Sequence, residues 1–386
     1  MFILYGTMFL FGFLDNIKGV SFPLIKNEFD ASYEIQGMMI SITSISYTLF
    51  VIASGFALSR FGIRKIFILG FIFIFLGVTL IYFMSGFWTV ASSLFLLCAG
   101  FGVSEIAMNS VATKVFTKKA ALMMNLLHFM YGAGAIAGPK VTGVLVNPVG
   151  VGLLWRQIYL FSIPLILIIF IPAVFVQFPA SAKSDAAGKG GPSFISALRT
   201  PSVWAFGITL GVMGSVEAAS TNWGGLYFQD LYGMDPTTSG ANFVSAFYVL
   251  FTLSRLASGF LIEKIGYMHS LVGAMLISTV IFVGGFALGA TGIYVLPLLG
   301  FFLAILWPTI LAVAIRRFGS NAPIMTAAVL AIAGLSIAGI QLLMGYINQW
   351  IGPGWGYRSC LLFSIIAICL LLGFKRQFKK PEAEFC

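Results

Sequence analysis

The sequence predicts an all-α membrane protein with twelve transmembrane helices in two six-helix bundles, and three observations lead to this prediction. The chain has 386 residues, of which 59% are hydrophobic and only 9% are charged, and its mean hydropathy is +1.01. Stretches of about 20 apolar residues, the length that a helix needs to cross a bilayer, recur from one end of the chain to the other. One long polar interruption, between Phe178 and Thr200, separates six such stretches from six.

Hydropathy places the spans of the first half at about 3–24, 33–58, 64–84, 88–113, 120–146 and 156–178. The spans of the second half follow at about 202–229, 238–262, 268–290, 292–316, 322–348 and 356–374. The chain thus divides into an N-terminal bundle (1–178), a linker loop (179–200), a C-terminal bundle (201–375) and a tail (376–386). The first apolar stretch has neither a basic leader nor a small-residue cleavage site, so we expect it to stay as a span.

Basic residues lie in the short gaps between the apolar stretches. Membrane insertion produces this distribution, so the formal net charge of +10 does not indicate a nucleic-acid partner. Counted alternately across the gaps, sixteen basic residues lie on one side and three on the other. The positive-inside rule predicts a multi-pass protein of the cell inner (plasma) membrane with both termini in the cytoplasm. The sixteen are Arg60, Arg64, Lys65, Lys114, Lys118, Lys119, Lys183, Lys189, Arg199, Lys264, Arg316, Arg317, Lys375, Arg376, Lys379 and Lys380, and the three are Lys26, Arg156 and Arg358.

An internal repeat relates the two halves. The segment that runs from Thr48 through Gly55 to Gly62 recurs 204 residues later, and Gly55 corresponds to Gly259. A repeat in the same orientation predicts two bundles related by an axis along the membrane normal. We expect Gly55 and Gly259 to lie where two helices approach closely, and the basic residues that follow to anchor the turn at the headgroups.

Both copies of the repeat resemble the signature loop of the major facilitator superfamily. The family pattern has Asp where this chain has Ser59, and the second copy keeps an acid at Glu263. The resemblance implies the major facilitator fold and secondary transport. The loop residues that we expect to act in the conformational change are Gly55, Arg60, Gly62, Arg64, Gly259, Glu263, Lys264 and Gly266.

Two further stretches resemble the fucose-permease branch of sugar–proton symporters in that superfamily. One runs from Ala99 through Glu105 and Asn109 to the region of Asn125, and the other surrounds Trp307 in span 10. The branch carries a glutamate and two asparagines at the positions that match Glu105, Asn109 and Asn125. It also has an aspartate in its first helix, about one turn from Asp15 when the sequences are aligned on Pro23.

Three carboxylates, Asp15, Glu105 and Glu217, lie within apolar stretches. A carboxylate in the membrane is costly when charged, so it is protonated or paired, and this makes it a candidate proton carrier. The alternative is a structural carboxylate that a neighbouring helix satisfies. For Asp15, an ion pair with Lys18 three residues later on the same helix face is such an alternative.

His128 and Arg255 complete the predicted coupling group. Glu105 and His128 lie nine residues from Lys114 and Lys119, so both sit about 13 Å from the cytoplasmic ends of their helices. Arg255 lies nine residues before Lys264, at a similar depth in the other half. These side chains are expected to surround one cavity near the midplane. The alternatives are a purely structural hydrogen bond for His128 and a structural ion pair for Arg255.

Amide and aromatic side chains on the same helix faces are candidates for contact with the solute. Amides bind hydroxyl groups, and a flat ring covers the apolar face of a sugar. The alternative for Trp223 is an anchor at the membrane interface. The full set of predicted solute-binding residues is Asn16, Asn109, Asn125, Tyr131, Asn222, Trp223, Tyr227 and Gln341.

These features favour a symporter that imports a small polar solute such as a sugar, driven by a cation gradient, with protons favoured over sodium. The alternative is a proton-driven efflux antiporter for amphipathic compounds, because Gly134-Ala-Ile-Ala-Gly138-Pro139 resembles a stretch of antiporters in the superfamily. No nucleophile–base pair or phosphate loop is visible, so we do not expect an enzyme. The spacing of the four cysteines, Cys98, Cys360, Cys369 and Cys386, predicts no disulfide and no metal site. We also expect no cofactor. We expect a monomer whose partners are the solute and the lipid bilayer.

Overall fold

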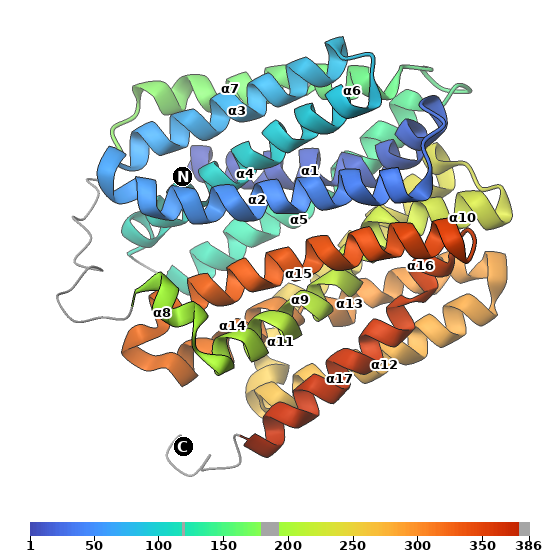
Figure 1. Cartoon of the computed structure of the whole chain (residues 1–386). Coiled ribbons are helices and arrows are strands. Elements are labelled where there is room, and N and C mark those ends of the chain that lie inside the picture. The colour runs from blue at the N-terminus through green and yellow to red at the C-terminus, as the bar shows by residue number, and fades with distance from the viewer. Residues whose placement is uncertain (118–119, 179–192, 378–386) are drawn as a thin grey trace.

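The computed structural model describes residues 1–117, 120–178 and 193–377, and in these ranges it consists of helices without strands (Figure 1). The predicted linker lies mostly outside the described residues, as do Lys118, Lys119, Lys183, Lys189 and the tail from 378 onward. In the first half, the spans are α1 (Phe2–Glu28), α2 (Tyr33–Phe61), α3 (Ile63–Phe83), α4 (Phe87–Val115), α5 (Ala120–Val146) and the pair α6 (Trp155–Phe161) and α7 (Ile163–Phe175).

The short α8 (Phe194–Leu198) lies within the predicted linker loop (179–200), so the described end of that segment is partly helical. The second half then repeats the pattern of the first with more interruptions. Its elements are α9 (Pro201–Asn222), α10 (Gly224–Tyr232), η2 (Pro236–Gly240), α11 (Ala241–Ile265), α12 (Tyr267–Ala287), η3 (Gly289–Tyr294), η4 (Leu296–Leu298), α13 (Leu299–Leu303), α14 (Leu306–Phe318), η5 (Gly319–Asn321), α15 (Ala322–Trp350), α16 (Trp355–Arg358) and α17 (Cys360–Gln377). The predicted spans agree with these bounds to within a few residues.

The helices of the described residues provide twelve membrane crossings. Within the described residues, 11 helical stretches are long and apolar enough to span a bilayer, and one of them, Gly289–Trp350, covers 62 residues. This stretch contains two crossings, because α14 ends at Phe318 and the chain reverses at Gly319, whose φ is 54°. A glycine adopts this left-handed conformation without the steric cost that a side chain would add. The protein is therefore a multi-pass membrane protein, as predicted.

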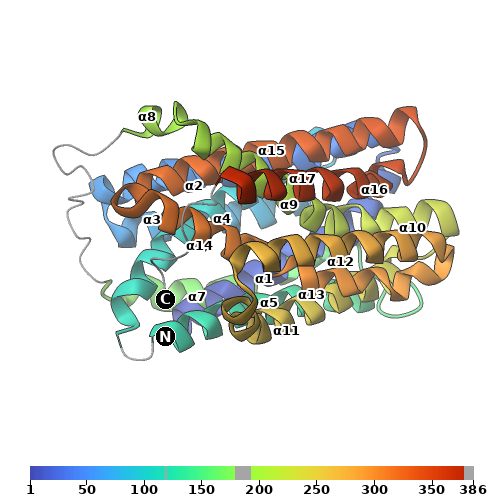
Figure 2. The ribbon, with the colours of Figure 1, turned by 90° about the horizontal axis from the view of Figure 1, so that it is seen from below.

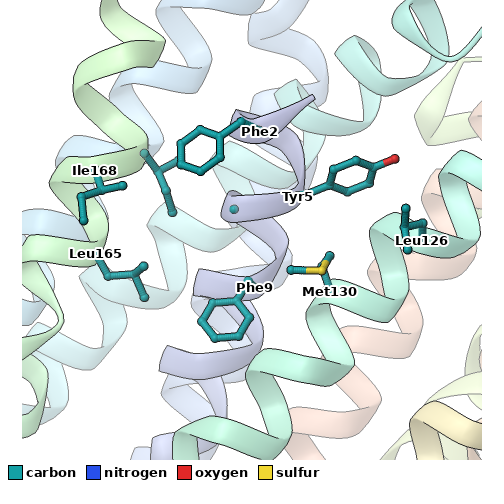
Figure 3. A pocket seen from close by; sticks show the side chains of 9 residues that line it. Phe2, Tyr5, Phe9, Leu126, Met130, Leu165 and Ile168 are labelled. Carbon is teal, nitrogen blue, oxygen red and sulfur yellow. The ribbon is translucent and has the colours of Figure 1, made fainter.

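Both views place the N-terminus, α8 and the last turn of α17 at one end of the bundle, which we call the terminal end (Figures 1 and 2). The opposite end, marked by α10 and α16, is called the loop end. The helices of the first half lie above those of the second in Figure 1, and α2 runs alongside α15 where the two halves meet. The second inter-half contact is between α5 and α11.

The repeat is visible in the backbone. Gly62 and Gly266, its last glycines, end α2 and α11 with φ of 81° and 91°. These values lie in the region that favours glycine, which explains why both copies keep this residue. The turn after Gly62 is held by Arg64, whose guanidinium donates a hydrogen bond to the carbonyl of Val174 in the last turn of α7. This contact satisfies one of the carbonyls that a helix C-terminus leaves free.

Across the interface, each half repeats the contacts of the other. The hydroxyl of Ser41 on α2 donates to the carbonyl of Ala338 on α15 over 2.6 Å, and that of Ser245 on α11 donates to the carbonyl of Ile136 on α5 over 3.0 Å. Ser245 follows Ser41 by 204 residues, the offset of the sequence repeat. The acceptors are 202 residues apart. The two hydrogen bonds are therefore related by the pseudo-twofold axis.

Glycines permit the close approach at this interface. A Cβ on Gly334 of α15 would lie 2.0 Å from Thr48 Oγ1, and one on Gly132 of α5 would lie 2.1 Å from Thr252 Oγ1. The two threonines are again 204 residues apart. Nearer the loop end, a Cβ on Gly37 would lie 2.9 Å from Gly345 Cα. The halves are thus closely packed from the loop end to the middle of the helices.

Toward the terminal end, this close packing stops. A Cβ on Gly55 of α2 or on Gly259 of α11 would have no heavy atom within 4 Å. The expectation that these two glycines mark a close helix contact is therefore wrong for this conformation. Arg60, Glu263 and Lys264, beyond them, are exposed. The physical reason is that the halves meet at the loop end and are separated here.

Candidate functional site

Glu105 on α4 lies beside Tyr47 on α2, inside the N-terminal half. The Tyr47 hydroxyl donates a short hydrogen bond to the Glu105 carboxyl, and 37% of Tyr47 remains exposed. Glu105 has no cation within ion-pair distance among the described residues. A carboxyl that has a neutral donor and no countercharge can take up and release a proton with little rearrangement.

Asn109 lies one turn further along α4. Its Oδ1 is buried and has no hydrogen-bond partner within the described part of the chain. Buried amide oxygens are nearly always hydrogen-bonded in folded proteins. The predicted solute-binding residue Asn109 thus has an unused acceptor one turn from Glu105.

The second predicted carboxylate, Asp15, forms the local ion pair that its spacing predicts. Lys18 Nζ lies 2.5 Å from Asp15 Oδ1, and the two side chains are 13% and 33% exposed, respectively. The hydroxyl of Tyr131 on α5 donates to Asp15 Oδ2 over 3.3 Å. Asp15 also lies close enough to Glu105 for the two carboxyls to interact electrostatically. The structure thus brings three of the predicted residues together on α1, α4 and α5.

Arg255 on α11 lies at the contact between the two halves. Its guanidinium carbon lies 4.5 Å from the centre of the Phe251 ring, and its Nε is buried without a hydrogen-bond partner among the described residues. It interacts electrostatically with Glu217 on α9 and with His128 on α5. His128 is itself exposed, as is Asn125 one turn before it.

Trp223 and Gln341 do not lie where the sequence places them. Both are buried, at 1% and 0% exposure, and the indole Nε1 donates to Gln341 Oε1 over 2.7 Å. Gln341 Nε2 donates in turn to the carbonyl of Ser215 over 3.2 Å. A buried indole N–H needs an acceptor, and here that need joins α9 to α15. Trp223 is neither open to a solute nor at the membrane interface in this conformation.

The remaining predicted solute-binding residues also differ in how far they are buried. Tyr227 on α10 is 2% exposed and lies among aromatic rings, including that of Tyr357 at 5.5 Å between ring centres. Asn16 is buried and donates to the carbonyl of Gly12 within its own helix over 2.9 Å. Asn222, at the end of α9, is half-buried. The accessible polar side chains therefore come mainly from α1, α4 and α5.

Tyr47 is the residue that sequence reasoning missed. It sits in an apolar stretch, where tyrosine is usually read as a membrane-facing or interfacial side chain. Tyr47 and Glu105 are 58 residues apart. A signal was available, because Tyr47 immediately precedes Thr48, the first residue of the internal repeat, on the helix that the repeat places at the interface.

A family model described as the Major Facilitator Superfamily matches residues 4–329. With this match over most of the chain, the protein belongs to the Major Facilitator Superfamily, a class of membrane transporters.

Individual relatives agree with this assignment. An uncharacterised MFS-type transporter of Yersinia pestis is 24% identical over 246 residues, which are 63% of this chain and 61% of the relative. The crystal structure of FucP, the Escherichia coli fucose:proton symporter, matches with a TM-score of 0.67 and 20% identity, and the match covers 97% of each chain. A structure of FucP in the outward conformation gives the same values. This likeness confirms the predicted fold.

Proposed function

We propose that the protein is a proton-coupled symporter that imports a small polar solute, such as a sugar, across the cell inner membrane by alternating access. The observation that carries this proposal is the pairing of Glu105 with the Tyr47 hydroxyl. A membrane carboxyl without a countercharge is costly when ionised, so its protonation changes the relative energies of the conformations that hydrate or bury it. Asn109, one turn from Glu105, and the exposed Asn125 on α5 carry amides that are suited to bind hydroxyl groups.

The charge asymmetry of the loops supports an orientation in which the terminal end faces the cytoplasm. In that orientation the structure is closed to the outside and separated toward the cytoplasm, which is the inward-facing state of an alternating-access cycle. FucP, a fucose:proton symporter, has been seen in the outward conformation. The fold is thus compatible with both ends of such a cycle.

The efflux alternative loses its main argument from sequence. A Cβ on Gly134 would lie 2.0 Å from the carbonyl oxygen of Phe9, and one on Gly138 would lie 2.3 Å from that of Phe13. The small residues of this stretch are therefore explained by the packing of α5 against α1. They carry no information about the direction of transport.

The test of the proposal is Glu105→Gln in proteoliposomes. A glutamine keeps the shape and hydrogen-bonding capacity of the side chain but does not bind a proton at this site, so uphill uptake should stop while counterflow exchange continues. Glu34→Gln is the matched control, because Glu34 lies in the first turn of α2 at the loop end. Normal concentrative uptake by Glu105→Gln would remove this carboxyl from the coupling role.

A further inference from the structure

Arg255 and His128 lie at the same level on two adjacent helices, where the two halves begin to separate. The helices α5 and α11 run antiparallel. Their close contact nearest the terminal end is between Gly132 and Thr252. One turn further toward the terminal end, this register brings His128 opposite Arg255, and the two side chains interact electrostatically. Both therefore border the space between the halves just below the closed interface.

The pseudo-symmetric position has a different character. On α2, the residue that precedes Arg255 by 204 is Val51, and on α15 the residue that follows His128 by 202 is Leu330. These two lie one turn below the contact between Thr48 and Gly334 and are apolar. Arg255 and His128, between α5 and α11, can thus donate hydrogen bonds to an anion. The symmetry-related side chains between α2 and α15 cannot.

The guanidinium of Arg255 stacks on an aromatic ring but has no carboxylate close enough to neutralise its charge. Its face lies on the Phe251 ring at 4.5 Å, which leaves the N–H edge free to bind a planar anion. No carboxylate lies within 4.0 Å of it among the residues that the structure describes, and its buried Nε has no partner there. Glu217 acts on it only at longer range. A buried donor of this kind indicates a missing acceptor.

We propose that Arg255, with His128 as a second donor, forms a carboxylate subsite, and that the solute is a hydroxylated monocarboxylate such as a sugar acid. The inference rests on the proposed function, which supplies the polyol part of the solute. The solute carboxylate binds the guanidinium edge, and its hydroxyls face the amides of the N-terminal half. In the empty protein, Glu217 compensates the charge of Arg255 from a distance.

The experiment measures the affinity of the purified full-length protein for two matched pairs, glucose with glucuronate and galactose with galacturonate. Propionate, which has a carboxylate and no hydroxyls, is the third probe. The wild-type protein should bind a uronate at least about tenfold more tightly than its hexose, the ratio expected for one charge-assisted contact. Arg255→Gln should lose this preference and keep the hexose affinity, and Arg255→Lys should retain part of it.

Val51→Ala, at the symmetry-related position, is the control and should leave the preference unchanged. Size-exclusion profiles and melting temperatures of all variants show whether each is folded. Equal affinity for hexose and uronate, or a preference that survives in Arg255→Gln, would overturn the subsite. Binding of propionate alone, lost in Arg255→Gln, would keep the subsite and overturn the sugar part of the proposed function. Binding of no probe would overturn both.

Discussion

At the scale of single residues, the carboxyls of this transporter differ in how their charge is balanced. Asp15 has Lys18 at 2.5 Å, whereas Glu105 has only the neutral Tyr47 hydroxyl. An ion pair keeps a carboxylate charged, and a hydroxyl donor tolerates either protonation state. The proposed role in proton exchange therefore belongs to Glu105, whereas Asp15 is engaged in a local ion pair with Lys18.

Trp223 provides a residue-scale prediction. Trp223→Phe leaves the Gln341 carbonyl oxygen without its donor inside the C-terminal half, at a cost of about 1–3 kcal/mol. The melting temperature of the purified protein should fall, while the affinity for a bound solute stays unchanged. Trp88→Phe is the control, because Trp88 is 52% exposed. A loss of solute affinity at unchanged stability would return Trp223 to the binding site.

The candidate site shows what sequence reasoning can and cannot find. Asp15, Glu105 and Glu217 stand out because a carboxylate in an apolar stretch is costly and rare. Tyr47 does not stand out, since an aromatic ring fits an apolar stretch without further cause. Trp223 is misassigned because the sequence shows that an indole and an amide exist but not that they bind each other.

At the scale of helices, the contact between the halves depends on two symmetry-related hydroxyls. Removing both in Ser41→Ala/Ser245→Ala deletes two interhelical hydrogen bonds, worth ~1.2 kcal/mol together in a membrane protein. The ratio of closed to open loop ends should fall about eightfold. Ser44→Ala is the control, since the Ser44 hydroxyl donates to the carbonyl of Ile40 within its own helix.

Spin labels report this population directly. Val149 and Trp350 are 95% and 77% exposed and lie at the loop end of the first and second halves. Labelled as Val149→Cys/Trp350→Cys in a chain whose native cysteines are replaced by serine, they should show a longer-distance population that grows in the double alanine variant. An unchanged distance distribution would mean that the two hydroxyls do not stabilise closure.

A second element-scale prediction concerns acid at the loop end. The hydroxyl of Tyr33 on α2 donates to Asp230 Oδ2 on α10 over 2.8 Å, and Lys26 Nζ lies 4.4 Å from the Tyr33 ring. Burial raises the pKa of Asp230 above its ordinary value, against the opposing effects of Tyr33 and Lys26. Opening of the loop end would hydrate this carboxyl and return its pKa toward about 3.9.

The sign of the effect follows from this difference. The pKa of Asp230 is higher in the closed form, so closure takes up a proton. This stabilisation is fully present below the ordinary pKa and is lost as the pH rises through the raised value. The closed population in the Val149–Trp350 distance measurement should therefore increase on acidification, and Asp230→Asn should remove that response. The same pH dependence in Asp230→Asn would show that another group is responsible.

At the scale of the whole molecule, the sequence predicts the architecture well because the bilayer imposes it. Twelve apolar stretches of spanning length and a repeat at an offset of 204 residues define two related bundles. The conformational state is not predictable in this way. It depends on which glycines pack against the opposite half: Gly334 does and Gly55 does not. Only the three-dimensional packing of the helices decides this.

Proton coupling through Glu105 is tested most sharply by solute-driven proton movement in proteoliposomes loaded with a pH-sensitive dye. A solute that binds the protein is added outside the vesicles, with no pH gradient or membrane potential imposed. Its entry should acidify the interior of vesicles that contain the wild-type protein and leave the internal pH unchanged with Glu105→Gln. Solute entry into wild-type vesicles without acidification, or equal acidification by Glu105→Gln, would contradict proton coupling through this carboxyl.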